Sequence, residues 1–131
     1  MSDFPAIGHV AGTVKDLAVS RPWYQRLIGA GPVLDEPTEA GFHHTVFAIS
    51  GTLIGLHEHP STDADDSFTE FHPGLDHISF GCVDRSALTT WQSRLDELGI
   101  AHGGIVDAHY GSGLSFRDPD GIALEFFAPP G

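Results

Sequence analysis

The chain repeats itself along its length, and this repeat limits the folds open to it more than any other feature. Five residue types recur at a constant offset of 68 positions, in the pairs His9 and His77, Asp16 and Asp84, Trp23 and Trp91, Arg26 and Arg94, and Leu27 and Leu95. Near the ends of the two halves the offset grows to 70, where 51–56 corresponds to 121–126. Repetition of this kind indicates two copies of one supersecondary unit. We therefore predict a single domain of two related modules, 5–58 and 75–128, joined by a linker at 59–74.

The sequence pattern of each module predicts a strand, a helix and then several strands. In the first module we predict strands near 7–14, 32–35, 42–50 and 52–57, with a helix capped by Asp16 or Ser20. Pro22 fits an early helical turn better than the helix interior. In the second module we predict strands near 76–83, 104–107, 112–117 and 122–127, with a helix whose apolar stripe is Leu88, Trp91, Leu95 and Leu98 and which stops at Gly99.

Composition restricts the class of partner. The 131 residues include 18 acidic and 6 basic side chains, giving a formal net charge of -12. This balance argues against nucleic acid and against an anionic membrane surface, since little positive charge is available to neutralise phosphate groups. It is compatible with a metal ion or a cationic small molecule. Cys82 is the one cysteine, so no intrachain disulfide can form, and we expect a buried, inert thiol in a cytoplasmic protein.

Strand alternation places three chemically notable residues on matching faces. Residues two apart on a strand share a face, so His9, His77 and Glu125 each lie opposite the apolar face that a helix would cover. A carboxylate within the apolar segment 123–127 is costly to bury unless it is paired or bound to a cation. Arg117, on the preceding predicted strand, is the competing partner. A metal ion explains the carboxylate and the duplicated histidines together.

Three segments carry a resemblance to a known family. They are His9 followed by Asp16 and Trp23, the run 75–80 (Leu-Asp-His-Ile-Ser-Phe), and the run 116–125, where Asp-Pro-Asp-Gly precedes three apolar residues and a glutamate. Together they resemble the vicinal oxygen chelate superfamily, which includes glyoxalase I, extradiol dioxygenases, fosfomycin-resistance transferases and bleomycin-resistance proteins. The resemblance covers nearly the whole chain. It implies an α+β fold in which two tandem βαβββ modules form a curved, half-open mixed sheet around the site.

The resemblance also implies a ligand set. The family's metal ligands fall on His9, His77 and Glu125, which implies one divalent ion such as Fe, Mn, Zn or Ni. Glyoxalase I-like members carry a fourth protein ligand at the position of Gly55, and glycine has no side chain to ligate with. The site therefore resembles the three-ligand arrangement of extradiol dioxygenases, which leaves positions open to water or substrate.

Two functions of different classes remain open at this stage. The first is a lyase, isomerase or ring-cleaving dioxygenase acting on a small oxygenated substrate, with Glu125 and His57 as catalytic candidates. His57 would serve as an acid–base group or substitute ligand, or would simply end its strand at the surface. The second is a bleomycin-resistance-like protein that sequesters a drug. Tyr110 and one member of the pair His43 and His44 are weaker candidates for the site, and we expect a homodimer that covers sheet edges.

Overall fold

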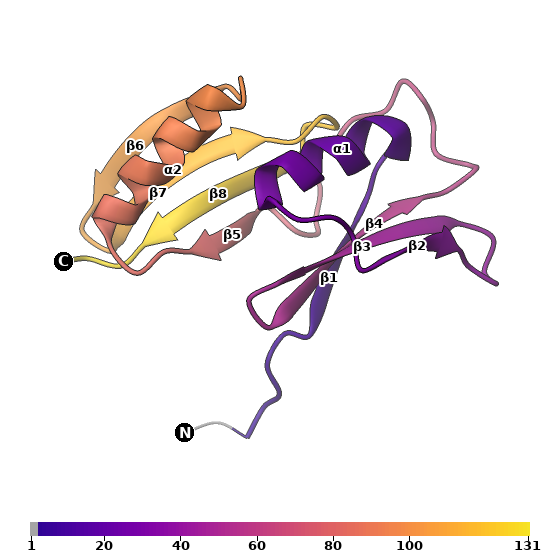
Figure 1. Cartoon of the computed structure of the whole chain (residues 1–131), viewed down its shortest axis with the longest axis horizontal. Coiled ribbons are helices and arrows are strands. Elements are labelled where there is room, and N and C mark those ends of the chain that lie inside the picture. Colours follow the sequence, from indigo (N-terminus) through magenta and orange to yellow (C-terminus); the bar gives the residue numbers. More distant parts are fainter. Residues whose placement is uncertain (1–2) are drawn as a thin grey trace. The chain divides into compact units, whose positions relative to one another are not determined.

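The computed structural model describes residues 3–131, and the chain divides into two compact units, Met1–Asp66 (unit 1) and Ser67–Gly131 (unit 2). The elements follow the order β1 (His9–Thr13), α1 (Leu17–Ile28), β2 (Leu34–Pro37), β3 (His43–Ile49), β4 (Thr52–Glu58), β5 (Ile78–Gly81), α2 (Arg85–Glu97), β6 (His102–Ala108), β7 (Gly111–Arg117) and β8 (Ala123–Ala128) (Figure 1). Both units thus have the predicted βαβββ order. Neither helix in residues 3–131 is long and apolar enough to cross a membrane.

The two units build their sheets in the same way. The strand order is β1-β4-β3-β2 in unit 1 and β5-β8-β7-β6 in unit 2. In each sheet the first strand runs parallel to the last one and the other neighbours are antiparallel. Ala11 pairs with Gly55 as Ser79 pairs with Glu125. The register therefore confirms that Gly55 takes in unit 1 the place that Glu125 takes in unit 2.

Helix α1 covers one face of the sheet in unit 1. Its N-cap is Asp16, whose side chain accepts a hydrogen bond from the Ala18 amide, so the alternative cap at Ser20 is wrong. The helix buries Leu17, Ser20, Tyr24 and Leu27. Pro22 consequently lies inside the helix and not in its first turn. Burial of this face against the sheet offsets the hydrogen bond that proline cannot donate.

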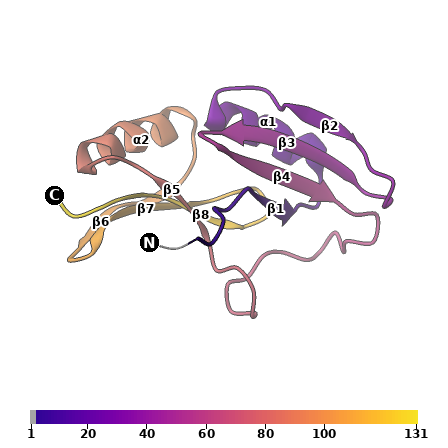
Figure 2. The same cartoon turned by 90° about the horizontal axis from the view of Figure 1, so that it is seen from below.

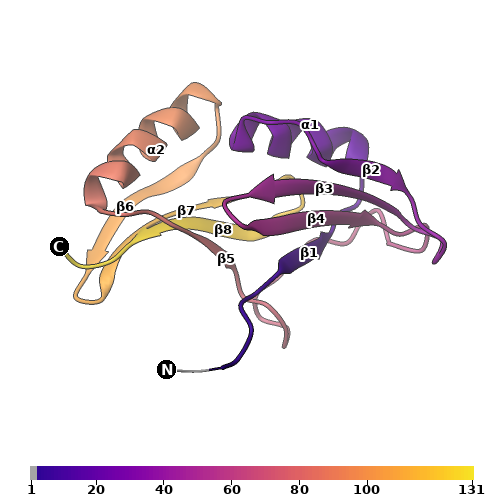
Figure 3. The same ribbon diagram turned by 60° about the horizontal axis from the view of Figure 1, so that its bottom comes forward.

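Helix α2 covers the corresponding face in unit 2, as Figures 2 and 3 show from two sides. Asp84 caps it, and Leu88 and Leu95 are fully buried. The Trp91 ring stacks on Phe126 with centroids 4.2 Å apart. Gly99 follows the helix with a φ of 72°, which confirms the predicted stop because a left-handed residue there ends the helix without strain.

A polar cluster holds the start of α2 to the β6–β7 hairpin. Arg85 binds Asp107 through two hydrogen bonds of 2.7 and 2.9 Å, and the Ser112 hydroxyl donates to the same carboxylate at 2.6 Å. The Arg85 guanidinium, followed by the Ser112 hydroxyl, lowers the pKa of Asp107 to about 2. The ion pair and the hydroxyl therefore favour the ionised form of this carboxylate.

The observed strands differ from the predicted ones mainly at their ends. Strand β5 is shorter than predicted, because its pairing with β8 runs only from Ile78 to Gly81. His77 and Cys82 consequently flank the strand and do not belong to it. Cys82 is half-buried, and this burial raises the pKa of its thiol, which favours the unreactive protonated form.

Candidate metal centre

Glu125 lies on the face of β8 that points away from α2. Along this strand the half-buried Ala123, Glu125 and Phe127 alternate with the buried Leu124, Phe126 and Ala128. The apolar set packs beneath α2, which turns the carboxylate to the open face of the sheet. The side chain of Glu125 remains 21% exposed. Its position follows directly from the alternation seen in the sequence.

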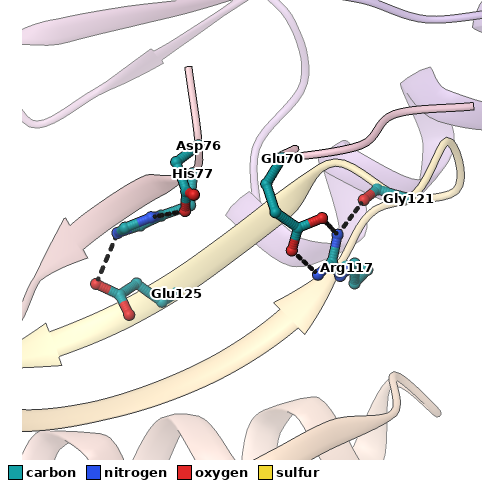
Figure 4. A network of polar contacts seen from close by, with 6 residues as sticks. All are labelled: Glu70, Asp76, His77, Arg117, Gly121 and Glu125. Carbon is teal, nitrogen blue, oxygen red and sulfur yellow. Dashed lines mark hydrogen bonds and ion pairs between the residues drawn. The ribbon is translucent and has the colours of Figure 1, made fainter. Parts of the chain in front are cut away.

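His77 meets Glu125 at this open face. Its Nε2 atom lies 3.4 Å from Oε1 of Glu125, and its Nδ1 atom lies 2.7 Å from Oδ1 of Asp76 (Figure 4). The imidazole is 44% exposed. The structure thus brings together two of the three predicted ligands, although they are 48 positions apart in the sequence.

Asp76 is the residue that sequence reasoning missed. A carboxylate that accepts a hydrogen bond from Nδ1 fixes the tautomer of a histidine and leaves Nε2 available as a ligand. Here Nε2 is the atom that faces Glu125. This hydrogen bond, with the negative charge of Glu125, raises the pKa of His77, although partial burial acts in the opposite direction. An acidic residue directly before a candidate ligand was the available signal.

Arg117 does not pair with Glu125, so that competing interpretation is wrong. Its guanidinium binds both carboxylate oxygens of Glu70, at 2.6 and 3.3 Å, and donates to the carbonyl of Gly121 at 2.9 Å (Figure 4). Glu70 belongs to the segment before β5, which no sequence pattern placed beside β7. With Arg117 engaged elsewhere, the partner that the structure gives to the Glu125 carboxylate is His77.

His9 opens β1 in unit 1, on the open face of that sheet. Strand alternation places His9, Ala11 and Thr13 on one face, and the last two pair with Gly55 and His57. The adjacent residue Glu58 points to the other face, where its carboxylate accepts a hydrogen bond from the Leu17 amide of α1 at 2.8 Å. His9 itself is exposed. It therefore lies on the same face as the position equivalent to Glu125.

His57 leans over Gly55. A Cβ atom on Gly55 would lie 3.5 Å from Nε2 of His57 and 3.6 Å from Cβ of Ala11. The imidazole thus stands beside the place where four-ligand members have a side chain. Burial lowers the pKa of His57, and the neighbouring histidines lower it further, in the order His44, His59 and His9. The lowered pKa favours the neutral ring, which is the form that can accept a proton.

His43 and His44 point to opposite faces of β3, as predicted. The Nε2 atom of His43 lies 2.6 Å from Asp35, whereas His44 faces His57 with ring centroids 6.0 Å apart. His44 alone of this pair therefore joins the histidines of the open face. The Phe42 ring stacks on His57 with ring centroids 4.5 Å apart.

Within residues 3–131, no group of three or more His, Cys, Asp or Glu side chains is placed to hold a metal ion. The structure supplies the pair His77 and Glu125 in unit 2, and His9 belongs to unit 1. The complete three-ligand set therefore stays a prediction.

A comparison with protein-family models identifies the family to which the chain belongs. The model of the Glyoxalase/Bleomycin resistance protein/Dioxygenase superfamily matches residues 6–126. The chain belongs to this superfamily. A glyoxylase/bleomycin resistance protein/dioxygenase domain from Frankia sp. EAN1pec is 30% identical in sequence to the present chain. The two structures superpose with a TM-score of 0.87, over 98% of this chain and 94% of the Frankia chain. The predicted resemblance and the α+β fold are both confirmed.

Two further solved structures share the fold at lower identity. A mutant of the fosfomycin resistance protein FosX from Listeria monocytogenes, complexed with Mn(II) and a dihydroxypropylphosphonic acid, is 19% identical with a TM-score of 0.69, over 97% of this chain and 94% of that one. Lactoylglutathione lyase from Agrobacterium tumefaciens is 17% identical with a TM-score of 0.70, over 97% and 96%. No curated protein sequence matches the chain. At these identities the two structures show a common fold only.

Proposed function

We propose that this superfamily member binds one divalent metal ion through His9, His77 and Glu125 and acts on a small substrate with two neighbouring oxygen atoms. The observation that carries the proposal is the His77–Glu125 pair, with Asp76 holding the imidazole and Arg117 bound elsewhere. Imidazole nitrogen and carboxylate oxygen are ligands that Mn, Fe, Ni and Zn all accept. FosX, a structural neighbour, is solved with Mn(II).

The distance between His77 and Glu125 suits two ligands of one metal ion. Metal–nitrogen and metal–oxygen bonds of about 2.0–2.2 Å separate adjacent ligand atoms by about 3.0–3.4 Å. The 3.4 Å between His77 Nε2 and Glu125 Oε1 lies at the upper end of this range. A metal would therefore need little movement of either side chain. We propose His9 as the third ligand, from the same chain or from a second copy in a homodimer.

The residues around the ion have separate tasks. When bound, the ion supplies a Lewis acid that holds vicinal oxygens and stabilises developing negative charge on them, or passes electrons to O₂. Glu125 and His77 fix its position, and Asp76 orients His77. We propose His57 as the acid–base group, because its Nε2 faces the open side of Gly55 and its lowered pKa favours the neutral ring. This arrangement fits a lyase, an isomerase or a ring-cleaving dioxygenase.

Metal reconstitution tests the proposal against drug sequestration. The protein is stripped with a chelator, loaded in turn with Mn(II), Fe(II), Ni(II) and Zn(II), and analysed for bound metal. We expect one ion per chain and metal-dependent binding of acetohydroxamic acid, which presents two vicinal oxygens. Protein that stays metal-free yet binds bleomycin tightly would instead favour the sequestering function, which the net charge of -12 would suit.

Gly55 provides a test of the open coordination position. Gly55→Glu restores the carboxylate of four-ligand members, so we expect metal affinity to rise and the affinity for acetohydroxamic acid to fall by at least roughly tenfold. Calorimetry measures both affinities. Gly55→Ala is the matched control, because its methyl group meets His57 and Ala11 only at ordinary contact distances. Identical behaviour of the two variants would show that Gly55 does not border the metal.

A further inference from the structure

Phe127 stands on the open face of β8, and its paired residue on each flanking strand is a glycine. It pairs with Gly81 on β5 and with Gly113 on β7. Alternation puts it on the same face as Glu125, two residues earlier. Its ring is half-buried, and no side chain from the adjacent positions of the two flanking strands covers it. A large aromatic ring is thus set between two glycines beside the candidate metal pair.

A second aromatic ring extends this surface. Tyr110 stacks on Phe127 with ring centroids 6.3 Å apart and an interplanar angle of 18°. The packing depends on Gly111, where an added Cβ would overlap Cζ of Phe127 and lie 2.5 Å from the carbonyl oxygen of Ala128. The φ of Gly111 is +144°, which other residues rarely adopt. Tyr110 remains 61% exposed, so the stacked pair presents an aromatic surface to solvent.

Gly113 connects this aromatic surface to the candidate metal pair. A Cβ atom on Gly113 would lie 3.4 Å from Oε2 of Glu125 and 3.9 Å from Cδ2 of Phe127. An atom above this glycine therefore touches the carboxylate and the aromatic ring at once. A group attached to a substrate held by Glu125 would meet the Phe127 ring above this glycine.

We propose that Tyr110, Phe127 and Gly113 form a subsite for a flat, apolar group, such as an aryl ring, attached to the substrate's oxygen pair. The proposal rests on the proposed metal function, and it names the substrate class of that site. Aromatic rings attract one another in offset-stacked or edge-to-face arrangements. An anionic substituent is disfavoured, because Arg117, the cation on the same face of β7, is held by Glu70. Glycine at position 113 leaves the room that the ring needs.

Two matched chelators test the subsite by calorimetry on the Mn(II)-loaded protein. Acetohydroxamic acid and benzohydroxamic acid present the same two oxygens, and only the second carries a phenyl ring. We expect benzohydroxamic acid to bind about tenfold more tightly to the wild-type protein. Tyr110→Ala should reduce this ratio about threefold, and Gly113→Ala should abolish it by filling the space. A ratio near one in the wild-type protein overturns the proposal, as does a ratio that neither variant changes.

Gly103→Ala is the matched control, since the same substitution on β6 meets no atom within 4 Å. It should keep the wild-type ratio, and a loss of the ratio in this variant would overturn the assignment to Gly113. Saturation-transfer NMR of benzohydroxamic acid with the metal-free protein gives a readout that does not need the ion. A phenyl signal that Gly113→Ala removes supports the subsite even if no metal binds. Metal-dependent binding of both chelators with equal affinity overturns the subsite and leaves the metal function standing.

Discussion

His77→Ala is expected to lower the metal affinity of the protein at least about 100-fold. Loss of an orienting partner behind a metal-bound histidine already costs about 10–100-fold, and removal of the ligand itself costs more. The geometry supports this size of effect, because Nε2 of His77 is the atom that faces Glu125. Competition with a metal-sensitive dye, followed by metal analysis after dialysis, measures the loss.

Two further variants show whether a loss of metal affinity in His77→Ala comes from the missing ligand or from a disturbed fold. His72→Ala removes another exposed histidine from unit 2 and should leave the metal affinity unchanged. Asp76→Ala should give a loss of about 10–100-fold, smaller than that of His77→Ala, since Asp76 acts only through the imidazole. Full metal occupancy in His77→Ala, with the fold intact by circular dichroism, would show that the metal lies elsewhere or that none is required.

Phe126→Ala is expected to cost about 3–5 kcal/mol of unfolding free energy, the usual range for removing a buried phenylalanine. The Phe126 ring is 5% exposed and packs against three aromatic rings, those of Trp91, Phe116 and Phe80. Such a loss is a large part of the stability of a domain of this size. Urea unfolding in the presence of a chelator measures it, because bound metal would stabilise the folded state.

Two comparison variants make this result interpretable. Phe71→Ala removes a ring that is 88% exposed and should change the unfolding free energy by no more than about 0.5 kcal/mol. Phe126→Leu keeps most of the buried volume, should cost less than about 1.5 kcal/mol, and stays measurable if Phe126→Ala fails to fold. A cost below about 1 kcal/mol for Phe126→Ala would contradict the packing of β8 beneath α2.

The predictions for the metal site and for Phe126 both concern strand β8, which carries Glu125 and Phe126. Phe126 anchors the strand in the core, and the adjacent Glu125 points to the open face because side chains alternate. The core face thus fixes the carboxylate in position, while the open face is free for chemistry. A variant on one face should therefore affect stability and a variant on the other should affect binding.

The amino-acid sequence alone predicted the two βαβββ units and the open-face positions of Glu125 and Gly55. It did so because repetition and strand alternation are local patterns that survive into the fold. It also predicted the stop of the second helix at Gly99 and a cap for the first helix, although the choice between Asp16 and Ser20 needed the structure. The prediction that Pro22 lies in an early helical turn is wrong, because tertiary burial of the helix outweighs the local preference of proline.

The contacts between charged side chains, in contrast, are visible only in the three-dimensional fold. Arg117 is near Glu125 in sequence and was the alternative to a metal as its partner, yet the guanidinium binds Glu70, 47 positions away. Asp76 became part of the candidate site through the orientation of one imidazole ring. Side-chain partners depend on rotamers and on the path of the segment before β5, which carry no periodic signal in the sequence. The repeat therefore predicts which residues form the candidate site, and the fold shows which side chains contact them.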